Sequence, residues 1–180
     1  MAFDPAAYWV ERGHGFEAEA RKQGWWGAEN EPLSDLLSTL TFASVLEVGC
    51  GFGRVGANIL SKWPQVRYTG MDVSPDLVAA AKRRLPDSEL FVSDLATWDT
   101  DRKWDLVVSV SVLGHLLPSD IKQVIAKMRR WARNDLVTID WDEVGGRTDY
   151  QWAHDYRKLY PKRVSRTPIG RLAMYHLSHG

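Results

Sequence analysis

Val45-Leu46-Glu47-Val48-Gly49-Cys50-Gly51-Phe52-Gly53-Arg54 carries the strongest structural signal in the sequence. A short apolar strand ends in three glycines at alternate positions, and apolar residues then recur with the period of a helix. Glycine lets a ligand lie directly against the backbone of a turn. Strand, glycine-rich turn and helix form the ligand-binding end of a doubly wound α/β sheet. The stretch therefore predicts an α/β fold with a cofactor site at this turn.

The glycine spacing separates two classes of cofactor site. A dinucleotide site uses G-x-G-x-x-G, whose third glycine allows the helix to pack closely on the strand. Here Gly49, Gly51 and Gly53 read G-x-G-x-G, and Arg54 stands where that third glycine belongs. The acidic Glu47 before the first glycine is also foreign to the NAD pattern. The run E-x-G-x-G-x-G resembles motif I of the class I S-adenosylmethionine (SAM)-dependent methyltransferases.

Two further strand ends extend this resemblance. A strand over 67–72 ends in Asp72, whose carboxylate can accept both hydroxyls of a ribose. A strand over 90–92 leads to Asp94 and an apolar residue, which in this family hold the adenine amino group and ring. The resemblance implies SAM as cofactor and S-adenosylhomocysteine (SAH) as product. The residues expected to bind the cofactor are Glu47, Gly49, Gly51, Gly53, Asp72, Val73, Ser93, Asp94, Leu95 and Ser111, joined by Tyr8 and Arg12.

The remaining chain completes the alternation of strands and helices. Strands are expected over 104–109 and 135–141, with a helix over 119–131 between them. A helix over 151–160 and two short strands, 163–167 and 171–177, joined by a Pro-Ile-Gly turn, follow. The resulting prediction is a doubly wound seven-stranded, mostly parallel sheet with a C-terminal antiparallel hairpin and helices on both faces.

Length and composition fit one domain over residues 1–180. We expect an N-terminal helical cap (1–43), a cofactor-binding half (44–141) and a substrate-side helix and hairpin (142–180). Lys and Arg together number 23, as do Asp and Glu, so no global basic field attracts nucleic acid or a membrane surface. The one cysteine, Cys50, excludes an intramolecular disulfide and is expected to pack inside the turn. Without a visible signal or membrane segment, the predicted location is cytoplasmic.

The N-terminal cap is rich in aromatic residues. Trp9 is expected to pack the cap onto the sheet, whereas Trp25 and Trp26 fit either packing or a lid over the pocket. Tyr8 and Arg12 lie one helical turn apart and can together reach a cofactor carboxylate; the alternative is a solvated helix face.

Few residues are candidates for catalysis. His115 follows the strand over 104–109, at the edge where the active site is expected, and histidine accepts protons near neutral pH. His154 and Tyr156 lie in a run, His-Asp-Tyr, that resembles one in small-molecule methyltransferases. Asp140 ends the strand over 135–141 and is expected to point into the same cleft.

Motifs that the sequence lacks restrict the class of molecule that can accept the methyl group. The loop 111–115 lacks the proline pair with which amino-methyltransferases grip a flipped base. Asp140 and Asp142 alone do not make a magnesium site, so no metal is expected. The sequence therefore predicts methyl transfer from SAM to an oxygen or nitrogen of a small molecule. Two alternatives stay open: a cofactor-binding but inactive partner or scaffold protein, and an RNA or nucleotide methyltransferase. The oligomeric state is left undetermined.

Overall fold

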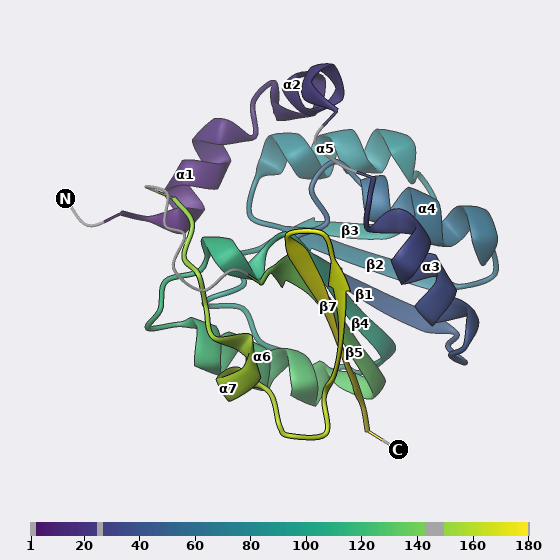
Figure 1. The fold of residues 1–180 in the computed structure, drawn as a ribbon. Helices are drawn as coiled ribbons and strands as arrows, with labels where there is room; N and C mark the ends of the chain where they lie inside the picture. Colours follow the sequence, from purple (N-terminus) through teal and green to yellow (C-terminus); the bar gives the residue numbers. More distant parts are fainter. Residues whose placement is uncertain (1–2, 25–26, 143–149, 180) are drawn as a thin grey trace.

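A seven-stranded mixed sheet forms the centre of the computed structural model, which describes residues 3–24, 27–142 and 150–179 (Figure 1). The strand order is β3-β2-β1-β4-β5-β7-β6. Strands β1 to β5 pair in parallel, and β7 runs antiparallel to both β5 and β6. This architecture confirms the predicted fold class. The strand bounds are β1 Ser44–Val48, β2 Arg67–Asp72, β3 Glu89–Val92, β4 Trp104–Val110, β5 Ala132–Trp141, β6 Ser165–Ile169 and β7 Leu172–Ser178.

Helices cover both faces of this sheet (Figure 1). Their bounds are α1 Pro5–Arg12, α2 Phe16–Gln23, α3 Asn30–Ser38, α4 Arg54–Lys62, α5 Pro75–Arg84, α6 Ile121–Trp131 and α7 Tyr156–Leu159. Successive side chains of a strand point to opposite faces. Leu46 and Val48 accordingly join the core beneath α6 and α7, whereas Val45 joins the core beneath α3, α4 and α5.

The strand order reverses at β1, which lies between β2 and β4. In open α/β sheets, ligands bind beyond the carboxyl ends of the strands at such a switch point. Here the first residues after β1 and β4 are Gly49 and Ser111, and β2 ends at Asp72. The fold therefore gathers the predicted cofactor residues at one edge.

The helix predicted over 151–160 is wrong for its first half, since α7 spans only Tyr156–Leu159. The preceding residues are bound to the loop after β4 instead: the Trp152 N–H donates to the Gly114 carbonyl (2.7 Å). His154 Nε2 likewise contacts the Leu116 carbonyl at 3.1 Å. These tertiary hydrogen bonds outweigh the local helical pattern, which carries little free energy by itself.

The C-terminal hairpin forms as predicted, with its turn displaced toward the C-terminus. Pro168 and Ile169 belong to β6, and Gly170, with φ of +59°, makes the turn. Proline is tolerated here because β6 is an edge strand, so one face of its backbone needs no sheet partner.

No helix within the described ranges is long and apolar enough to cross a membrane. The cytoplasmic location and the single-domain organisation stay predictions.

Candidate cofactor and active site

The three glycines of the turn after β1 all have positive φ: +70° at Gly49, +52° at Gly51 and +81° at Gly53. A Cβ on Gly49 would lie 2.3 Å from Val112 Cγ2, and one on Gly53 would lie 3.3 Å from the Ala81 Cα. A Cβ on Gly51 would meet nothing within 4 Å. Gly49 and Gly53 thus allow close packing of neighbouring segments, whereas Gly51 faces open space that a ligand can fill.

Asp72 ties the end of β2 to this turn. One carboxylate oxygen accepts the Gly51 N–H and the other accepts the Ser74 N–H, both at 2.9 Å. Burial raises the pKa of Asp72 above its usual range, and the backbone donors act against that rise. A carboxylate has about four acceptor positions, so two backbone donors leave room for ligand hydroxyls. Val73, the next residue, is half-buried beside it.

Glu47 lies beneath the turn, between the sheet and α4. Only 2% of its surface is exposed, and it accepts a hydrogen bond from the Tyr68 hydroxyl. Gly56 makes room for this pair, because a Cβ there would lie 2.5 Å from Tyr68 Cζ. Burial raises the pKa of Glu47 to about 8. The structure thus places Glu47 as a support beneath the turn, and its contact with a cofactor stays a prediction.

The raised pKa of Glu47 predicts a pH-dependent stability. The folded protein binds this proton more tightly than the unfolded chain, so the stabilisation is complete below about pH 4.5 and is lost as pH rises toward 8. In Glu47→Gln, an uncharged isostere, we expect the decline in melting temperature between pH 5 and pH 8 to shrink by several degrees, since 1 kcal/mol corresponds to about 2–4 °C for a chain of this length. Thermal denaturation monitored by circular dichroism tests this. The exposed Glu31→Gln is the control and should keep the wild-type decline; an equal decline in Glu47→Gln would contradict the assignment.

The segment after β3 lies at the same edge of the sheet as Asp72. The Ser93 N–H donates to the Asp72 carbonyl (2.9 Å), which joins this segment to the end of β2. Asp94 is half-buried, and its carboxylate accepts the Ala96 N–H at 2.9 Å. Leu95 turns inward and joins the apolar core. Asp94 can therefore face a ligand, whereas the contacts of Ser93 and Leu95 with a cofactor stay predictions.

A strained residue opens the loop after β4. In the part of the chain that the structure describes, Ser111 is the one non-glycine residue with positive φ, +58°. Its N–H donates to the Ile139 carbonyl (2.7 Å), which fixes this conformation. Such strain is concentrated at ligand sites. Ser111 accordingly stays a predicted cofactor contact.

Asp140 holds this loop, which corrects its predicted position in the cleft. The side chain is 1% exposed, and one carboxylate oxygen accepts the N–H groups of Val112 (3.0 Å) and Leu113 (2.7 Å). A Cβ on Gly114 would lie 2.8 Å from the other oxygen, so only glycine fits. Burial raises the pKa of Asp140 to about 6. Asp140 shapes the loop that carries His115 and does not itself reach a substrate.

His115 lies under the N-terminal cap. Its ring centroid is 4.7 Å from that of Trp9, nearly perpendicular to it, and Nδ1 is 3.0 Å from the Tyr150 carbonyl. A carbonyl only accepts, so Nδ1 carries the proton and Nε2 keeps the lone pair. Burial lowers the pKa of His115 to about 4, so the ring is neutral at pH 7.

His154 and Tyr156 are buried, with exposed fractions of 7% and 2%. His154 Nε2 contacts the Leu116 carbonyl, and the Tyr156 ring packs 5.4 Å from that of Tyr175. His154 lies next to the loop that carries His115, yet its side chain and that of Tyr156 are enclosed, and their catalytic roles stay predictions.

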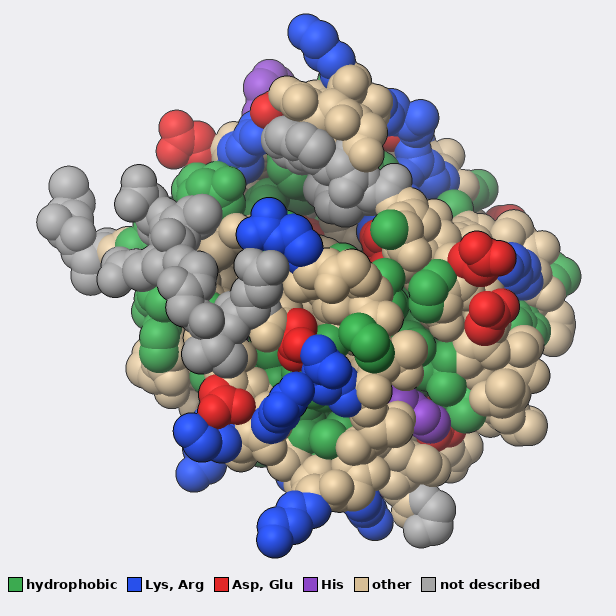
Figure 2. All heavy atoms as spheres, viewed as in Figure 1, with side chains coloured by type: hydrophobic (Ala, Val, Ile, Leu, Met, Phe, Trp, Pro, Cys, Tyr) green, Lys and Arg blue, Asp and Glu red, His purple; other side chains and the backbone are tan. Residues whose placement is uncertain are grey.

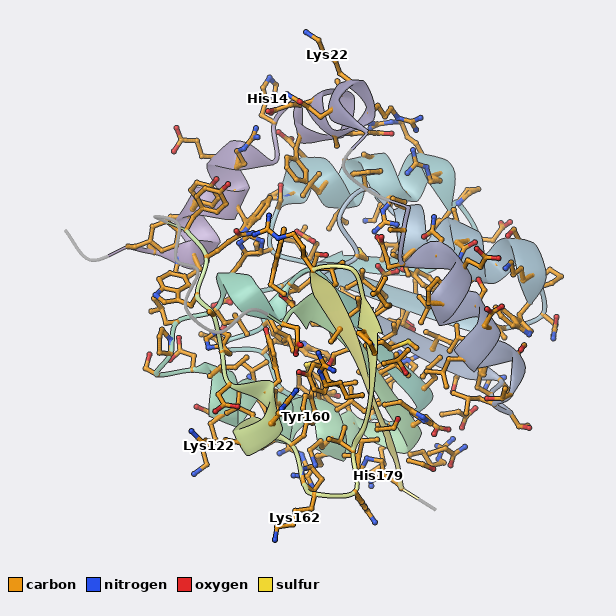
Figure 3. The ribbon with its side chains drawn as sticks, viewed as in Figure 1. His14, Lys22, Lys122, Tyr160, Lys162 and His179 are labelled. Atoms are coloured by element: carbon orange, nitrogen blue, oxygen red, sulfur yellow. The ribbon has the colours of Figure 1, made fainter. Side chains whose placement is uncertain are left out.

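The N-terminal cap crosses the edge of the sheet. At one end Trp9 contacts His115; at the other a Cβ on Gly13 would lie 2.0 Å from Ser74 Oγ, at the start of α5. Figure 3 shows His14 on this side, and its Nδ1 lies 3.3 Å from Asp76 Oδ2. Helix α1 therefore spans from the loop after β4 to the turn after β2.

Tyr8 and Arg12 lie on this crossing helix. Arg12 pairs with Glu19 at 2.5 Å, and Tyr8 stacks on Tyr150 with ring centroids 5.1 Å apart. Their contact with a cofactor carboxylate stays a prediction, as does the alternative of a solvated face. Trp25 and Trp26, the other candidates for a lid, lie outside the described residues.

Cys50 is buried and packs against β2, in keeping with the predicted packing role. Among residues 3–24, 27–142 and 150–179, no three His, Cys, Asp or Glu side chains gather as a metal site requires.

The doubly wound sheet, the glycine turn at its switch point and the acids at the ends of successive strands define a nucleotide-type cofactor-binding protein. Residues 46–135, half of the chain, match the family model described as a methyltransferase domain. The chain belongs to this family.

A curated relative, the trans-aconitate 2-methyltransferase of Escherichia coli O1:K1, is 32% identical over 149 residues, which cover 81% of this chain and 44% of the relative. The chain thus spans less than half the length of the curated relatives it matches. Two solved structures share the fold: the magnesium protoporphyrin IX methyltransferase of Synechocystis with bound SAM (TM-score 0.73, 14% identity, 99% of each chain), and an amino pentose methyltransferase of Micromonospora echinaspora with bound SAM (TM-score 0.76, 16% identity, 92% of this chain and 96% of that one).

Proposed function

We propose that this protein is a SAM-dependent methyltransferase that transfers a methyl group to an oxygen or nitrogen of a small molecule and releases SAH. The observation that carries the proposal is the pairing of Gly51 with Asp72. Gly51 leaves an open space over the backbone, and Asp72, bonded to the Gly51 N–H, supplies a carboxylate at its border. The Asp72 carboxylate can accept the ribose hydroxyls, and the absence of a side chain at Gly51 lets the ribose lie against the backbone.

The residues at the edge fit the other parts of this cofactor. Asp94 would accept the adenine amino group, with Leu95 and Ser93 beside it, and Ser111 and the three glycines would line the path toward the methionine portion. Tyr8 and Arg12 would approach its carboxylate from α1. When bound, SAM supplies a methyl group on a positively charged sulfur, already activated for displacement.

The protein then has to align the acceptor and exclude water, effects that contribute up to roughly 7–11 kcal/mol in well-oriented systems. The crossing of α1 over the edge supports water exclusion, because Trp9 and Gly13 close it from both ends. The strained backbone at Ser111 and the clamp by Asp140 support a fixed position for His115.

We propose His115 as the general base when the acceptor is a hydroxyl or an ammonium group. With its pKa near 4, the ring keeps Nε2 unprotonated throughout the neutral range. We expect kcat/KM to stay flat between pH 6 and 8 and to fall below about pH 5. His115→Ala should lower kcat about 10²-fold or more and remove this inflection.

Steady-state rates from pH 4.5 to 8.5 test the role of His115, with SAH binding measured in parallel. The control is His14→Ala, whose ring is exposed at the far end of α1. Intact turnover by His115→Ala with unchanged SAH affinity would exclude His115 as the base.

The proposed function itself is tested by isothermal titration with SAM and SAH, followed by a panel of small organic acids, amines and hydroxyl compounds with SAH release as the readout. The name of the trans-aconitate relative favours starting with organic acids. Failure to bind either SAM or SAH would contradict the proposal. Binding without turnover of any acceptor would favour the scaffold alternative.

An RNA or nucleotide acceptor is the second alternative. The formal net charge is zero, and on the face seen in Figure 2 the Lys and Arg side chains occur in separate groups with acidic residues among them. Several arginines are paired, as Arg133 is with Asp105 and Arg166 with Asp142. Negligible affinity for RNA at low salt would eliminate this alternative.

A further inference from the structure

Lys127 is a buried cation on α6, only 4% exposed. Its ammonium group donates to three backbone carbonyls, those of Leu95 (2.7 Å), Ala96 (2.9 Å) and Trp98 (2.8 Å). An ammonium group has three N–H donors and no acceptor, so three carbonyls satisfy it completely. All three belong to the short segment that follows β3.

That segment is a single helix-like turn that begins at Asp94. The Trp98 N–H donates to the Asp94 carbonyl at 2.8 Å, and the Asp94 side chain accepts the Ala96 N–H in the manner of an N-terminal cap. The last carbonyls of such a turn have no partner within it. Lys127 supplies that partner, so Asp94 caps the turn at its start and Lys127 at its end.

Packing alone does not require a charge at this place. The neighbouring Trp131 ring lies 4.8 Å from that of Trp98 and holds the same segment to α6. An apolar side chain at position 127 would extend this packing but would leave three carbonyls without donors. A buried carbonyl without a donor loses the hydrogen bond it would make with water, and Lys127 removes this cost for all three carbonyls.

We propose that Lys127 is a positioning residue for recognition of the adenine amino group: by fixing the turn from its far end, it holds the Asp94 carboxylate in the direction that accepts this group. The inference rests on the proposed function, since it requires a cofactor with an adenine ring at Asp94. Lys127 itself does not touch the ligand.

The test compares two ligands that differ only at the base edge with the recognised group. S-inosylhomocysteine carries a carbonyl oxygen where SAH carries the amino group, and its N1 carries a proton, so the donor that Asp94 would accept is replaced by an acceptor. We expect the wild-type protein to bind SAH at least tenfold more tightly, as measured by isothermal titration. Lys127→Met should reduce this preference to about threefold or less, with Lys127→Gln and Lys127→Arg in between. If Lys127→Met does not fold, the preference for SAH measured in Lys127→Gln and Lys127→Arg tests the proposal, since both variants keep donors for the carbonyls.

The ratio of the SAH affinity to the S-inosylhomocysteine affinity distinguishes a positioning role from a loss of stability, because partial unfolding weakens the binding of both ligands equally. Lys122→Met is the matched control: Lys122 lies on the same helix and extends away from the molecule (Figure 3). This variant should keep the full preference. A wild-type protein that binds neither ligand would contradict the proposed function. A wild-type protein that binds both equally, or Lys127 variants that keep the full preference, would overturn this inference alone.

Discussion

Replacing Asp72 with alanine is expected to weaken the binding of SAM and SAH by about 100-fold. The ribose hydroxyls lose a charged acceptor, and hydrogen bonds to charged groups contribute about 1.5–3 kcal/mol each. The Gly51 and Ser74 N–H groups lose their partner at the same time, so the turn is also less well positioned. Isothermal titration with SAH gives the affinity, and thermal denaturation shows whether the fold persists.

Two further variants test whether the loss of SAH affinity in Asp72→Ala comes from the missing carboxylate. Asp72→Asn keeps the shape and one acceptor oxygen, and its affinity should lie between those of the wild type and Asp72→Ala. Asp76→Ala removes a nearby acid on α5 that is exposed, and should leave SAH binding unchanged. An Asp72→Ala protein with wild-type affinity would contradict the placement of the ribose.

Gly51→Ala should produce the second large effect: loss of SAH binding by tenfold or more in a protein that remains folded. The added methyl group meets no protein atom within 4 Å, so it occupies the space assigned to the ligand. Its positive φ of +52° costs only about 1–2 kcal/mol in a residue other than glycine. Titration with SAH and a melting curve measure the two effects separately.

Gly170→Ala is the matched control for this experiment. Gly170 has φ of +59°, also meets nothing within 4 Å, and lies in the hairpin turn between β6 and β7. Its alanine variant should lose similar stability and keep full SAH affinity. If both variants bind SAH as the wild type does, the space over Gly51 does not hold the cofactor.

The sequence could predict features whose causes are local. Gly49, Gly51 and Gly53 adopt the positive φ values that favour glycine, and Ser74 and Pro75 begin α5 as a cap and a first helical residue do. Asp72 ends β2 and Asp94 comes two residues after β3, so a parallel sheet brings them to the same edge. Alternating and helical apolar patterns were therefore sufficient for the sheet and most of its helices, whereas the cofactor contacts of these residues stay predictions.

Features that depend on distant partners were not predictable in this way. The partners of Asp140 are the backbone groups of the loop after β4, and those of Lys127 lie after β3. The one local signal for Lys127 is a charge between Val124 and Trp131, three and four residues away on the buried side of α6. His154 and Tyr156 are enclosed in the fold, and their residue types gave no indication of that burial.

The glycine turn and the acids after successive strands thus determined the fold and the predicted cofactor class from the sequence alone, because backbone conformation and strand ends are properties of short segments. Which polar groups face open space and which are enclosed depends on the folded arrangement. In the folded protein Glu47 lies beneath the turn, Asp140 lies within the loop that it holds, and His115 lies under the cap. The physical reason is that the burial and hydrogen-bond partners of a side chain depend on segments far away in the chain, which only the folded arrangement brings into contact.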